Sequence, residues 1–503
     1  MAVDASRAEG RRLVTSNYKE LLHALLPEAS LVIGAVLVLG VDLVTGKKNT
    51  GTARLRAGVY IALFAVVAAM YHTCDAGTGG AAFGGVLMLD SLARATRLGV
   101  LVLTAFTLAL TPGVTRLRNP AEYVAIVLFA TTGFTLMAVA QQLLVAFLAL
   151  ELASLSLYVL AGFDKTKPES AEAALKYFLF GGISAAFMLF GFSLIYGLTG
   201  SIELAEIARQ LSVMPPNTLL IVALVMVLAG FGFKAAAAPF HLWAPDVYQG
   251  APVPSAALIA SASKLAGFVL FVRLLWTGLG PAAGSLGAVG GATGWIPVVA
   301  IISAASLLLG NIAALAQSNV RRLLAYSAIA HAGAMLLGVI AAGHSGPAPL
   351  FYYAATYGLA SVGAFGVIAV VERAGRCQQL SDLAGLHQRS PLLAACLLVF
   401  VLSLAGIPPL AGFFGKFIVF AAALKLGGLA TSAGWLTLLA IAMSAVGLYY
   451  YLLILKQAVV ARPAPDAATP IPVPAPAAIV LLLIATLLVV LGVFPSVVLR
   501  LIS

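Results

Sequence analysis

Long apolar segments alternate with short polar connections along almost the whole chain. Apolar stretches of membrane-spanning length recur from residue 21 to residue 502, and about 20 apolar residues cross a bilayer as a helix. Hydropathy and helix punctuation predict an all-α polytopic membrane protein with about fourteen transmembrane helices and no strands. We expect the spans near residues 25–45, 55–72, 92–111, 121–139, 141–163, 173–198, 217–249, 254–277, 295–315, 322–342, 348–372, 391–426, 432–457 and 476–500.

Two of these spans, the seventh and the twelfth, are too long for one crossing and contain proline where a helix should be continuous. The seventh contains Pro239 and Pro245, and the twelfth contains the run Gly406-Ile407-Pro408-Pro409. Proline removes a backbone donor and clashes with the preceding turn. Both spans are therefore predicted to be broken helices, whose freed backbone groups need a buried or hydrated cavity.

Two connections are not plain loops. Residues 201–211 carry apolar side chains on one helical face, which predicts a short interfacial helix beside the membrane; these are Leu204, Ile207, Ala208 and Leu211. The segment from Pro463 to Pro476 contains six prolines. We expect this segment to be a non-helical connector before the last span.

Composition excludes a soluble protein. Hydrophobic residues make up 62% of the 503 residues and charged residues only 9%, with a mean hydropathy of +1.05, whereas soluble proteins carry about 25% charged residues. A β-barrel is excluded too, because stretches such as Ala478 to Phe494 are apolar throughout except for Thr486. The first twenty residues are polar and do not match a removable signal peptide.

The net charge of +11 is explained most simply by topology. Lys and Arg concentrate in cytoplasmic loops of membrane proteins. Here they follow odd-numbered spans, at Lys47, Lys48, Arg54, Arg56, Arg116, Arg118, Lys165, Lys167, Arg321, Arg322, Arg373, Arg376, Arg389 and Arg462. We therefore expect these loops to be cytoplasmic and both termini to be periplasmic, although the basic N-terminal tail then disobeys the rule. No basic domain lies outside the membrane, which argues against nucleic-acid binding.

The three cysteines, Cys74, Cys377 and Cys396, are scattered, without a Cys-x-x-Cys or Cys/His cluster. Zinc and iron–sulfur sites need such clusters. We expect no metal and no redox cofactor in this chain, so any redox chemistry belongs to partner subunits.

Ionisable side chains inside the predicted spans are the main functional candidates. Each costs about 2.5–3.5 kcal/mol at mid-membrane depth, so each needs a partner or a purpose. They are Glu151, Lys176, Lys234, Lys264, His331 and Lys416, with His241 beside the first break and Arg273 late in the eighth span. Arg273 is expected to snorkel to the interface.

Glu151 and Lys234 can be interpreted as a structural ion pair or as proton carriers, and we favour carriers. A desolvated lysine releases its proton more readily, and an adjacent carboxylate restores the charge. Lys264 has no acid on its own helix, which also favours proton carriage.

The histidines and Lys176 are candidates for relays. His331 can donate and accept through its two ring nitrogens, which suits a proton relay between lysines. His241 fits packing about as well as a relay. Lys176 could equally snorkel to the interface.

The candidate residues recur with similar spacing, which indicates an internal repeat. Glu151 precedes Lys234 by 83 residues, and His331 precedes Lys416 by 85. In this interpretation Lys416 is the counterpart of Lys234, and His331 takes the position of Glu151. An offset of five spans inverts the second unit in the membrane, as in many transporters.

The repeat suggests a division of the chain into five parts. They are a polar tail (1–20), helices one to three (21–120), a first unit of helices four to eight (121–277), a second, inverted unit of helices nine to thirteen (295–457), and the connector with helix fourteen (458–503). In this scheme two half-channels meet through Lys264 and His331.

Five segments resemble a known family. They are 151–160 (ELASLSLYVL), 174–181 (ALKYFLFG), 239–252 (PFHLWAPDVYQGAP), 321–331 (RRLLAYSAIAH) and 404–416 (LAGIPPLAGFFGK). Together they resemble the antiporter-like, proton-conducting subunits of respiratory complex I, from about Leu26 to the last span. The segment around Asp246 resembles the N type. The lysine at 416 argues against the M type, which carries a glutamate there.

The resemblance implies that Glu151 and Lys234 are a coupled pair, Lys264 the central lysine and Lys416 the terminal lysine of a proton path. It implies a relay role for His331 and matches Lys176 to a family lysine. It further implies a multi-pass subunit of the bacterial inner membrane. NADH, FMN, iron–sulfur clusters and quinone would then belong to partner subunits, beside neighbouring antiporter-like and small membrane subunits.

Other functions fit the same residues. A subunit of a multisubunit sodium/proton antiporter, or of a membrane-bound hydrogenase or ferredoxin-linked complex, would share the fold and lysines. A passive scaffold is a third interpretation. It is disfavoured because the lysines outnumber the acids at mid-membrane depth.

Overall fold

The computed structural model describes residues 20–45, 50–114, 117–215, 217–286, 294–375, 377–429, 431–463 and 469–502. Most of the polar tail, four residues of the predicted basic loops and the centre of the proline-rich connector lie outside the described residues; the four are Lys47, Lys48, Arg116 and Arg376.

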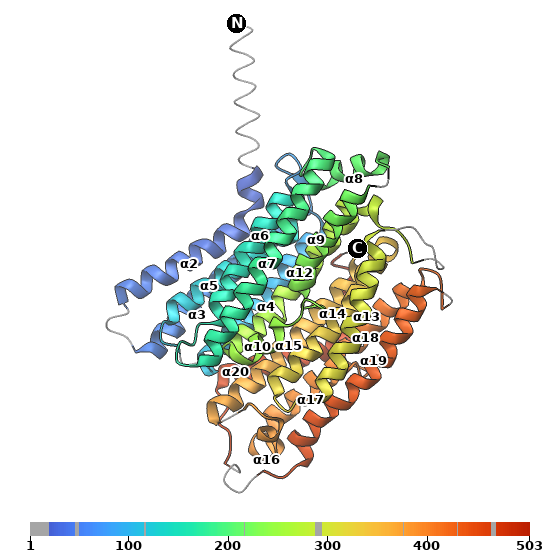
Figure 1. Ribbon diagram of the computed structural model, residues 1–503. Coiled ribbons are helices and arrows are strands. Elements are labelled where there is room, and N and C mark those ends of the chain that lie inside the picture. The colour runs from blue at the N-terminus through green and yellow to red at the C-terminus, as the bar shows by residue number, and fades with distance from the viewer. Residues whose placement is uncertain are drawn as a thin grey trace.

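The described chain is a bundle of membrane-length helices (Figure 1). It contains 13 helices long and apolar enough to span a membrane, and a pair of shorter ones completes the fourteen predicted crossings. The single-piece crossings are α2 (Leu26–Thr45), α3 (Gly51–Asp75), α4 (Ser91–Val114), α5 (Pro120–Val139), α6 (Leu143–Ala161), α7 (Pro168–Thr199), α13 (Trp295–Leu315), α14 (Val320–Ser345), α15 (Ala348–Ala374), α19 (Ser432–Leu455) and α20 (Ala475–Val493). The fold is therefore the all-α membrane protein that the sequence predicts.

The seventh and twelfth crossings are broken, as the prolines predict. The seventh consists of α9 (Thr218–Ala235) and α10 (Trp243–Gly250), and the twelfth of α17 (Pro391–Ala405) and α18 (Ala411–Leu424). Each first half ends at a residue in the left-handed conformation, Ala236 (φ 56°) or Gly406 (φ 86°). Proline follows three residues later in both, at Pro239 and Pro409. The two breaks therefore match residue by residue, 170 positions apart.

The eighth crossing is broken as well, which the sequence does not predict. It consists of α11 (Val253–Ala260), α12 (Ala262–Val272) and the π-helical turn η2 (Arg273–Gly278), followed by a short 3₁₀ turn, η3 (Gly280–Ala282). Ser261, with φ −114° and ψ −86°, separates α11 from α12. This irregularity lies three residues before Lys264, at the centre of the bundle.

A small hairpin between α3 and α4 corrects the expectation of no strands. Strand β1 (Gly80–Ala82) pairs antiparallel with β2 (Leu87–Leu89).

Arg273 does not snorkel as expected, because it is buried and its guanidinium pairs with Asp90 directly after this hairpin, at 2.5 Å. This ion pair joins the start of α4, directly after the hairpin, to the end of the eighth crossing.

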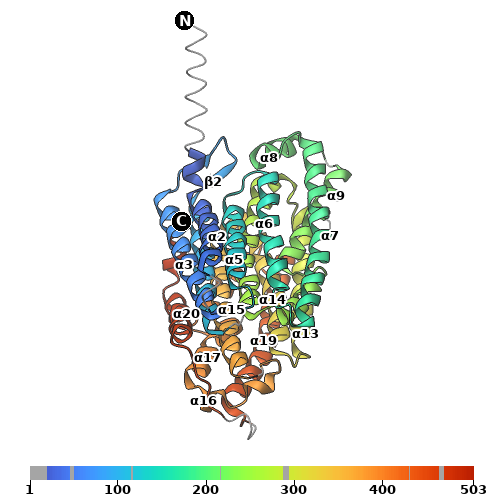
Figure 2. The same ribbon diagram turned by 90° about the vertical axis from the view of Figure 1, so that its left-hand side faces the viewer.

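The predicted interfacial helix is α8 (Leu204–Val213), which buries Leu204, Ile207 and Leu211 against the bundle. On its exposed side Arg209 and Gln210 donate to Glu206, and these hydrogen bonds lower the pKa of that carboxyl to about 2. Figure 2 shows β2 and α8 at one end of the bundle and the short helix α16 (Leu386–Arg389) at the other. The remaining short elements are η4 (Leu380–Leu383), η5 (Lys456–Val460) and α21 (Ser496–Leu499).

Matched backbone pairings support the repeat. An antiparallel bridge joins Gln142 to Glu203 directly before α6, and another joins Asn319 to Gln379 directly before α14. Each bridge is made by the same two backbone hydrogen bonds between flanking residues. Because α6 and α14 are the fifth and tenth crossings, the odd offset turns the second unit over in the membrane.

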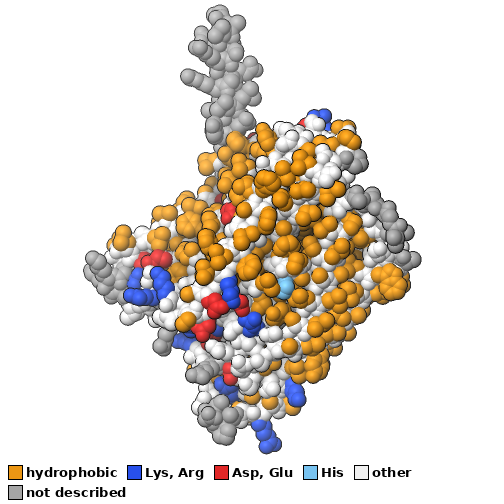
Figure 3. Space-filling model, viewed as in Figure 1, with side chains coloured by type: hydrophobic (Ala, Val, Ile, Leu, Met, Phe, Trp, Pro, Cys, Tyr) orange, Lys and Arg blue, Asp and Glu red, His pale blue; other side chains and the backbone are white. Residues whose placement is uncertain are grey.

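Most of the outer surface is apolar. Figure 3 shows hydrophobic side chains over most of one face, with Lys, Arg, Asp and Glu confined to a few clusters. Large apolar residues of α7 are exposed, including Phe178, Ile183 and Phe190, which suits contact with lipid. By contrast, the eighth crossing is buried along its whole apolar stretch, and α14 and α15 almost so.

Candidate functional site

Glu151 lies on α6 and Lys234 on α9, and the two side chains do not touch; helix α7 packs against both α6 and α9. Glu151 Oε1 and Lys234 Nζ are both buried without a hydrogen-bond partner, and no ion pair of 4.0 Å or less joins them among the described residues. They interact electrostatically at longer range. Lys234 Nζ lies 5.7 Å from the ring centroid of Phe134. The structure thus places the predicted pair close together, with both charges left open to other partners.

Lys234 and Lys264 border the same small cavity. It is lined by Phe231, Lys234, Ala235, Lys264, Gly267, Phe268 and Phe271. Glycine at 267 eases the close approach of α12 to Lys234, because a Cβ there would lie 3.3 Å from Lys234 Cγ, closer than an ordinary contact. Two lysines of different helices therefore share one small space with aromatic walls.

Lys264 is bonded to both units. Its Nζ donates to the carbonyl of Ala235 (3.3 Å), the last residue of α9, and to that of Ala328 (2.6 Å) in α14. The last carbonyls of a helix have no partner within the helix and carry partial negative charge. The break in the seventh crossing therefore supplies the acceptor that the sequence could not assign to this lysine.

His331 has a hydroxyl at each ring nitrogen. Nδ1 is 2.7 Å from the hydroxyl of Tyr353, and Nε2 is 3.0 Å from that of Tyr451, which also bonds to Ser327. The ring of Tyr357 lies beside both His331 and Lys264. Its centroid is 4.7 Å from that of the imidazole ring and 5.7 Å from Lys264 Nζ. These tyrosines extend the polar chain from Lys264 towards the second break.

Lys416 lies beyond this tyrosine cluster. Its Nζ donates to the carbonyl of Ala405, the last residue of α17, at 2.9 Å. Lys416 and His331 border a second small cavity, with Tyr353, Tyr450, Tyr451 and Asn311 among its lining residues. Lys264 and Lys416 thus donate to equivalent carbonyls. These are the carbonyls of Ala235 and Ala405, which lie 170 positions apart.

The residue-level match between the two units differs from the prediction. Lys234 precedes its break, whereas Lys416 follows its own, so Lys416 corresponds to Asp246 and Lys234 to Leu404 at the offset of 170. Counted from the bridges, Glu151 corresponds to Ala328. The expectation that Lys416 mirrors Lys234 is wrong because equal spacing between titratable residues does not fix their positions relative to a break.

The remaining relay candidates lie elsewhere. Lys176 forms ion pairs of 2.6 Å with Glu172 and with Asp246, so it bridges α7 and α10 rather than extending freely to the interface. His241 is buried and its Nδ1 has no hydrogen-bond partner among the described residues. Among the described residues, no hydrogen bond joins His241 to any of the candidate lysines.

The sequence did not single out the tyrosines or the partners of Asp246. The hydroxyls of Tyr353 and Tyr451 bond to His331, and Asp246 accepts from Lys176 and Arg322. The runs Tyr352-Tyr353 and Tyr449-Tyr450-Tyr451 inside apolar spans were the available signal, because a buried hydroxyl needs a partner.

Comparison with known proteins identifies the family. The sequence model described as "NADH:quinone oxidoreductase/Mrp antiporter, TM" matches residues 140–448, more than half of the chain. The chain belongs to this family of membrane subunits. It is 46% identical to a protein of Acidobacterium capsulatum named NADH-quinone oxidoreductase subunit N 2, over 96% of this chain and 99% of that protein.

Solved structures agree with this assignment. A chain of respiratory complex I from Thermus thermophilus with bound aureothin is 34% identical and superposes with a TM-score of 0.78, over 94% of this chain and 98% of the other. A chain of the Mrp complex from Dietzia is 21% identical with a TM-score of 0.80, over 96% of both chains, and shows the shared fold. This fold therefore occurs in both kinds of assembly.

Proposed function

We propose that this chain is a proton-translocating subunit of a bacterial respiratory NADH:quinone oxidoreductase and contains no redox centre of its own. One observation carries the proposal: Lys264 donates to a carbonyl of each unit and so joins the cavity of Lys234 to the cluster around His331. Lys234, Lys264, His331 and Lys416 then form one path of protonatable groups across the two units.

The chemistry of the path follows from its residues. A desolvated lysine can change charge, unlike arginine, and helix C-terminal carbonyls stabilise its ammonium form. Glu151 lies close enough to Lys234 to favour its charged form. His331 can accept a proton at one ring nitrogen and release one from the other, because the hydroxyls of Tyr353 and Tyr451 hydrogen-bond to the two nitrogens.

The proposal places this chain in the bacterial inner membrane, with both termini periplasmic, among antiporter-like and small membrane subunits. NADH, FMN, iron–sulfur clusters and quinone belong to other subunits, whose reaction drives the protons here. The relatives named NADH-quinone oxidoreductase subunit N and the likeness to a chain of a solved respiratory complex I support this setting.

The test is Lys234→Ala in the complete complex. We expect coupled quinone reduction and proton pumping to fall by about tenfold or more, since a positioned proton carrier contributes about 10²–10⁴-fold. Reduction of an artificial acceptor by the peripheral subunits and assembly on native electrophoresis should be unchanged. Exposed Lys425→Ala is the matched control. Normal pumping in Lys234→Ala would refute the proposal.

Purification through a tag on this chain tests the assembly. Copurification of flavin and iron–sulfur subunits that oxidise NADH supports the oxidoreductase. Copurification of small membrane subunits alone would instead indicate a sodium/proton antiporter, and iron–sulfur subunits that accept electrons only from ferredoxin would indicate a ferredoxin-linked complex.

A further inference from the structure

Helix α10 is the second half of the broken seventh crossing and has only eight residues. The break separates it from the backbone hydrogen bonding of α9, so side chains of other helices hold it in place. Arg322 of α14 donates to Asp246 Oδ1 (2.5 Å) in the first turn of α10 and to Gln249 Oε1 (3.0 Å) in its last turn. Neighbouring Arg321 donates to the carbonyl of Ala251 (3.0 Å), directly after α10. We call these five residues the arginine clamp.

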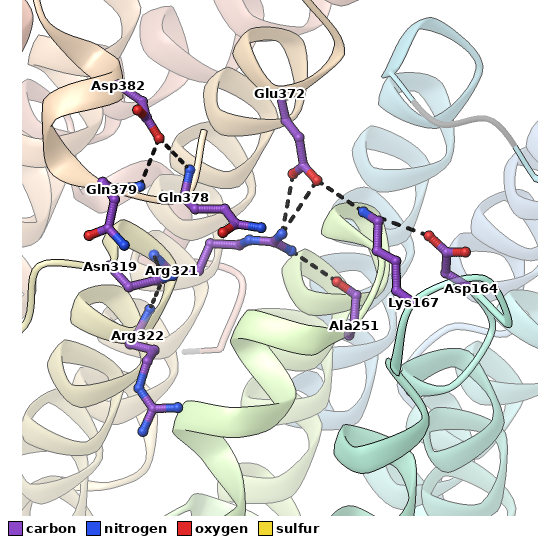
Figure 4. Close-up of polar contacts among 10 residues, drawn as sticks. All are labelled: Asp164, Lys167, Ala251, Asn319, Arg321, Arg322, Glu372, Gln378, Gln379 and Asp382. Carbon is purple, nitrogen blue, oxygen red and sulfur yellow. Dashed lines mark hydrogen bonds and ion pairs between the residues drawn. The ribbon is translucent and has the colours of Figure 1, made fainter. Parts of the chain in front are cut away.

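The clamp is anchored on both sides. Figure 4 shows the Arg321 side chain between Ala251 and Glu372 of α15, which it meets at 3.3 Å. Glu372 also pairs with Lys167, just before α7, at 3.3 Å. On the other side of α10, Asp246 accepts from Lys176. Helix α10 is thus tied to α7 of its own unit and to α14 and α15 of the other.

The repeat does not demand this clamp. Counted from the matched bridges at Gln142 and Asn319, Arg321 and Arg322 correspond to Leu144 and Val145 at the start of α6. Those apolar side chains cannot hold a half-helix by charge-assisted hydrogen bonds. Among the described residues, the equivalent positions of the first unit therefore make no such clamp, which lies where the first unit meets the second.

Helix α14 connects the clamp to the candidate path. It carries the acceptor carbonyl of Ala328 and the ring of His331, which lies nine residues after Arg322, about 14 Å along the helix axis. Helix α10 follows the break directly after Lys234. A rigid helix therefore links the half-helix beside the first cavity to the groups beside the second.

We propose that Arg321 and Arg322 are positioning residues that couple the two units. By holding α10 against α14, they keep the cavity of Lys234 and Lys264 aligned with Ala328 and His331. The effect on pumping rests on the proposed function, whereas the effect on the position of α10 does not.

The test uses Arg322, whose side chain is part-exposed, in the complete complex. The variants are Arg322→Gln, Arg322→Lys and, as matched control, Arg118→Gln, an exposed arginine of another basic loop. Spin labels at Leu242, exposed just before α10, and at Leu315, the exposed last residue of α13, report the position of α10 by pulsed electron paramagnetic resonance. Exposed Cys74 is replaced by serine to remove unwanted labelling.

Arg322→Gln should broaden the distance distribution between the labels and lower protons pumped per electron by about two- to thirtyfold, the range for residues that modulate coupling. Arg322→Lys retains one charged donor for Asp246 and should restore at least half of the pumping. Arg118→Gln should change neither readout.

An unchanged distance distribution in Arg322→Gln would overturn the clamp. A broadened distribution with normal pumping would overturn its role in coupling. Lys234→Ala separates the two proposals: if that variant pumps normally, the proposed function fails, while the distance measurement still decides whether the clamp holds α10.

Discussion

Lys264 Nζ donates across the boundary between the two units to the carbonyl of Ala328, at 2.6 Å. Ala328 occupies in α14 the position that Glu151 occupies in α6, counted from the matched bridges. The first unit therefore offers a carboxylate near its lysine where the second offers a backbone carbonyl. A carbonyl cannot take up a proton, so we expect the adjustable charge to lie in the first unit.

Glu151→Gln should lower coupled turnover more than Glu151→Asp. Aspartate keeps the charge that acts on Lys234, whereas glutamine removes it, and the lack of direct contact between the two side chains makes the shorter acid tolerable. Turnover measured from about pH 6 to pH 9 checks this. Identical profiles for glutamine and wild type would mean that the carboxylate is idle.

Lys416→Arg should assemble and fail to pump. Arginine keeps a positive donor for the Ala405 carbonyl, but its pKa above about 12 prevents proton release. We expect a loss of about tenfold or more, measured as proton uptake in membranes with assembly checked on native gels. Lys425→Arg is the control. If pumping persists, Lys416 acts as a fixed charge.

Tyr353→Phe and Tyr451→Phe should each slow pumping. Each change removes the hydroxyl at one nitrogen of His331 and keeps the ring that packs. We expect about a two- to tenfold loss, because a hydrogen bond contributes about 0.5–1.5 kcal/mol. Tyr449→Phe changes an exposed neighbour and should have no effect. Equal rates in all three variants would limit these tyrosines to packing.

Gly406→Ala should destabilise the second break, and Ala236→Gly should not destabilise the first. Gly406 has φ 86°, and a Cβ there would lie 3.0 Å from Lys416 Cδ. A side chain in the left-handed region costs about 1–2 kcal/mol. Gly406→Ala should therefore lower thermal stability of the complex and pumping, while Ala236→Gly, which relieves φ 56°, retains both. If Ala236→Gly lowered thermal stability more than Gly406→Ala did, backbone strain at these two positions would not control the breaks.

Maleimide should label Cys74 and spare Cys377 in the folded protein. Cys74 is exposed, whereas burial raises the pKa of the Cys377 thiol to about 12. At about pH 8 the thiolate fraction of Cys377 is then on the order of 10⁻⁴, and it rises as the pH approaches 12. Peptide mass analysis before and after denaturation checks the difference. Rapid native labelling of Cys377 would contradict its burial.

Much of the fold was predictable because crossing a membrane requires long apolar helices. The expected span 295–315 coincides with α13, and the prolines revealed both predicted breaks. The break at Ser261 was not predictable, because neither proline nor glycine stands there. There the Ser261 hydroxyl donates to the carbonyl of Ala257, four residues earlier, which often bends a helix but does not by itself predict a break.

The candidate site was predictable residue by residue but not as an arrangement. Charges inside apolar spans are conspicuous, so the lysines, Glu151 and His331 could be named from their positions. Their partners could not, because Lys264 and Lys416 bond to backbone carbonyls that any residue supplies. Arg273 was wrongly assigned to the interface because Asp90, its partner, lies 183 residues earlier.

The length of α7 sets the depth of one group of charges. Its 32 residues extend about 48 Å, some 18 Å more than the hydrocarbon core of about 30 Å. Lys176 lies eight residues, about 12 Å, from the Pro168 end of α7. The share of the excess at that end therefore decides how strongly phosphate and water compete with its ion pair to Asp246. Bilayer thickness and headgroup charge should therefore tune how firmly α10 is held, while the deeper Lys234 stays shielded.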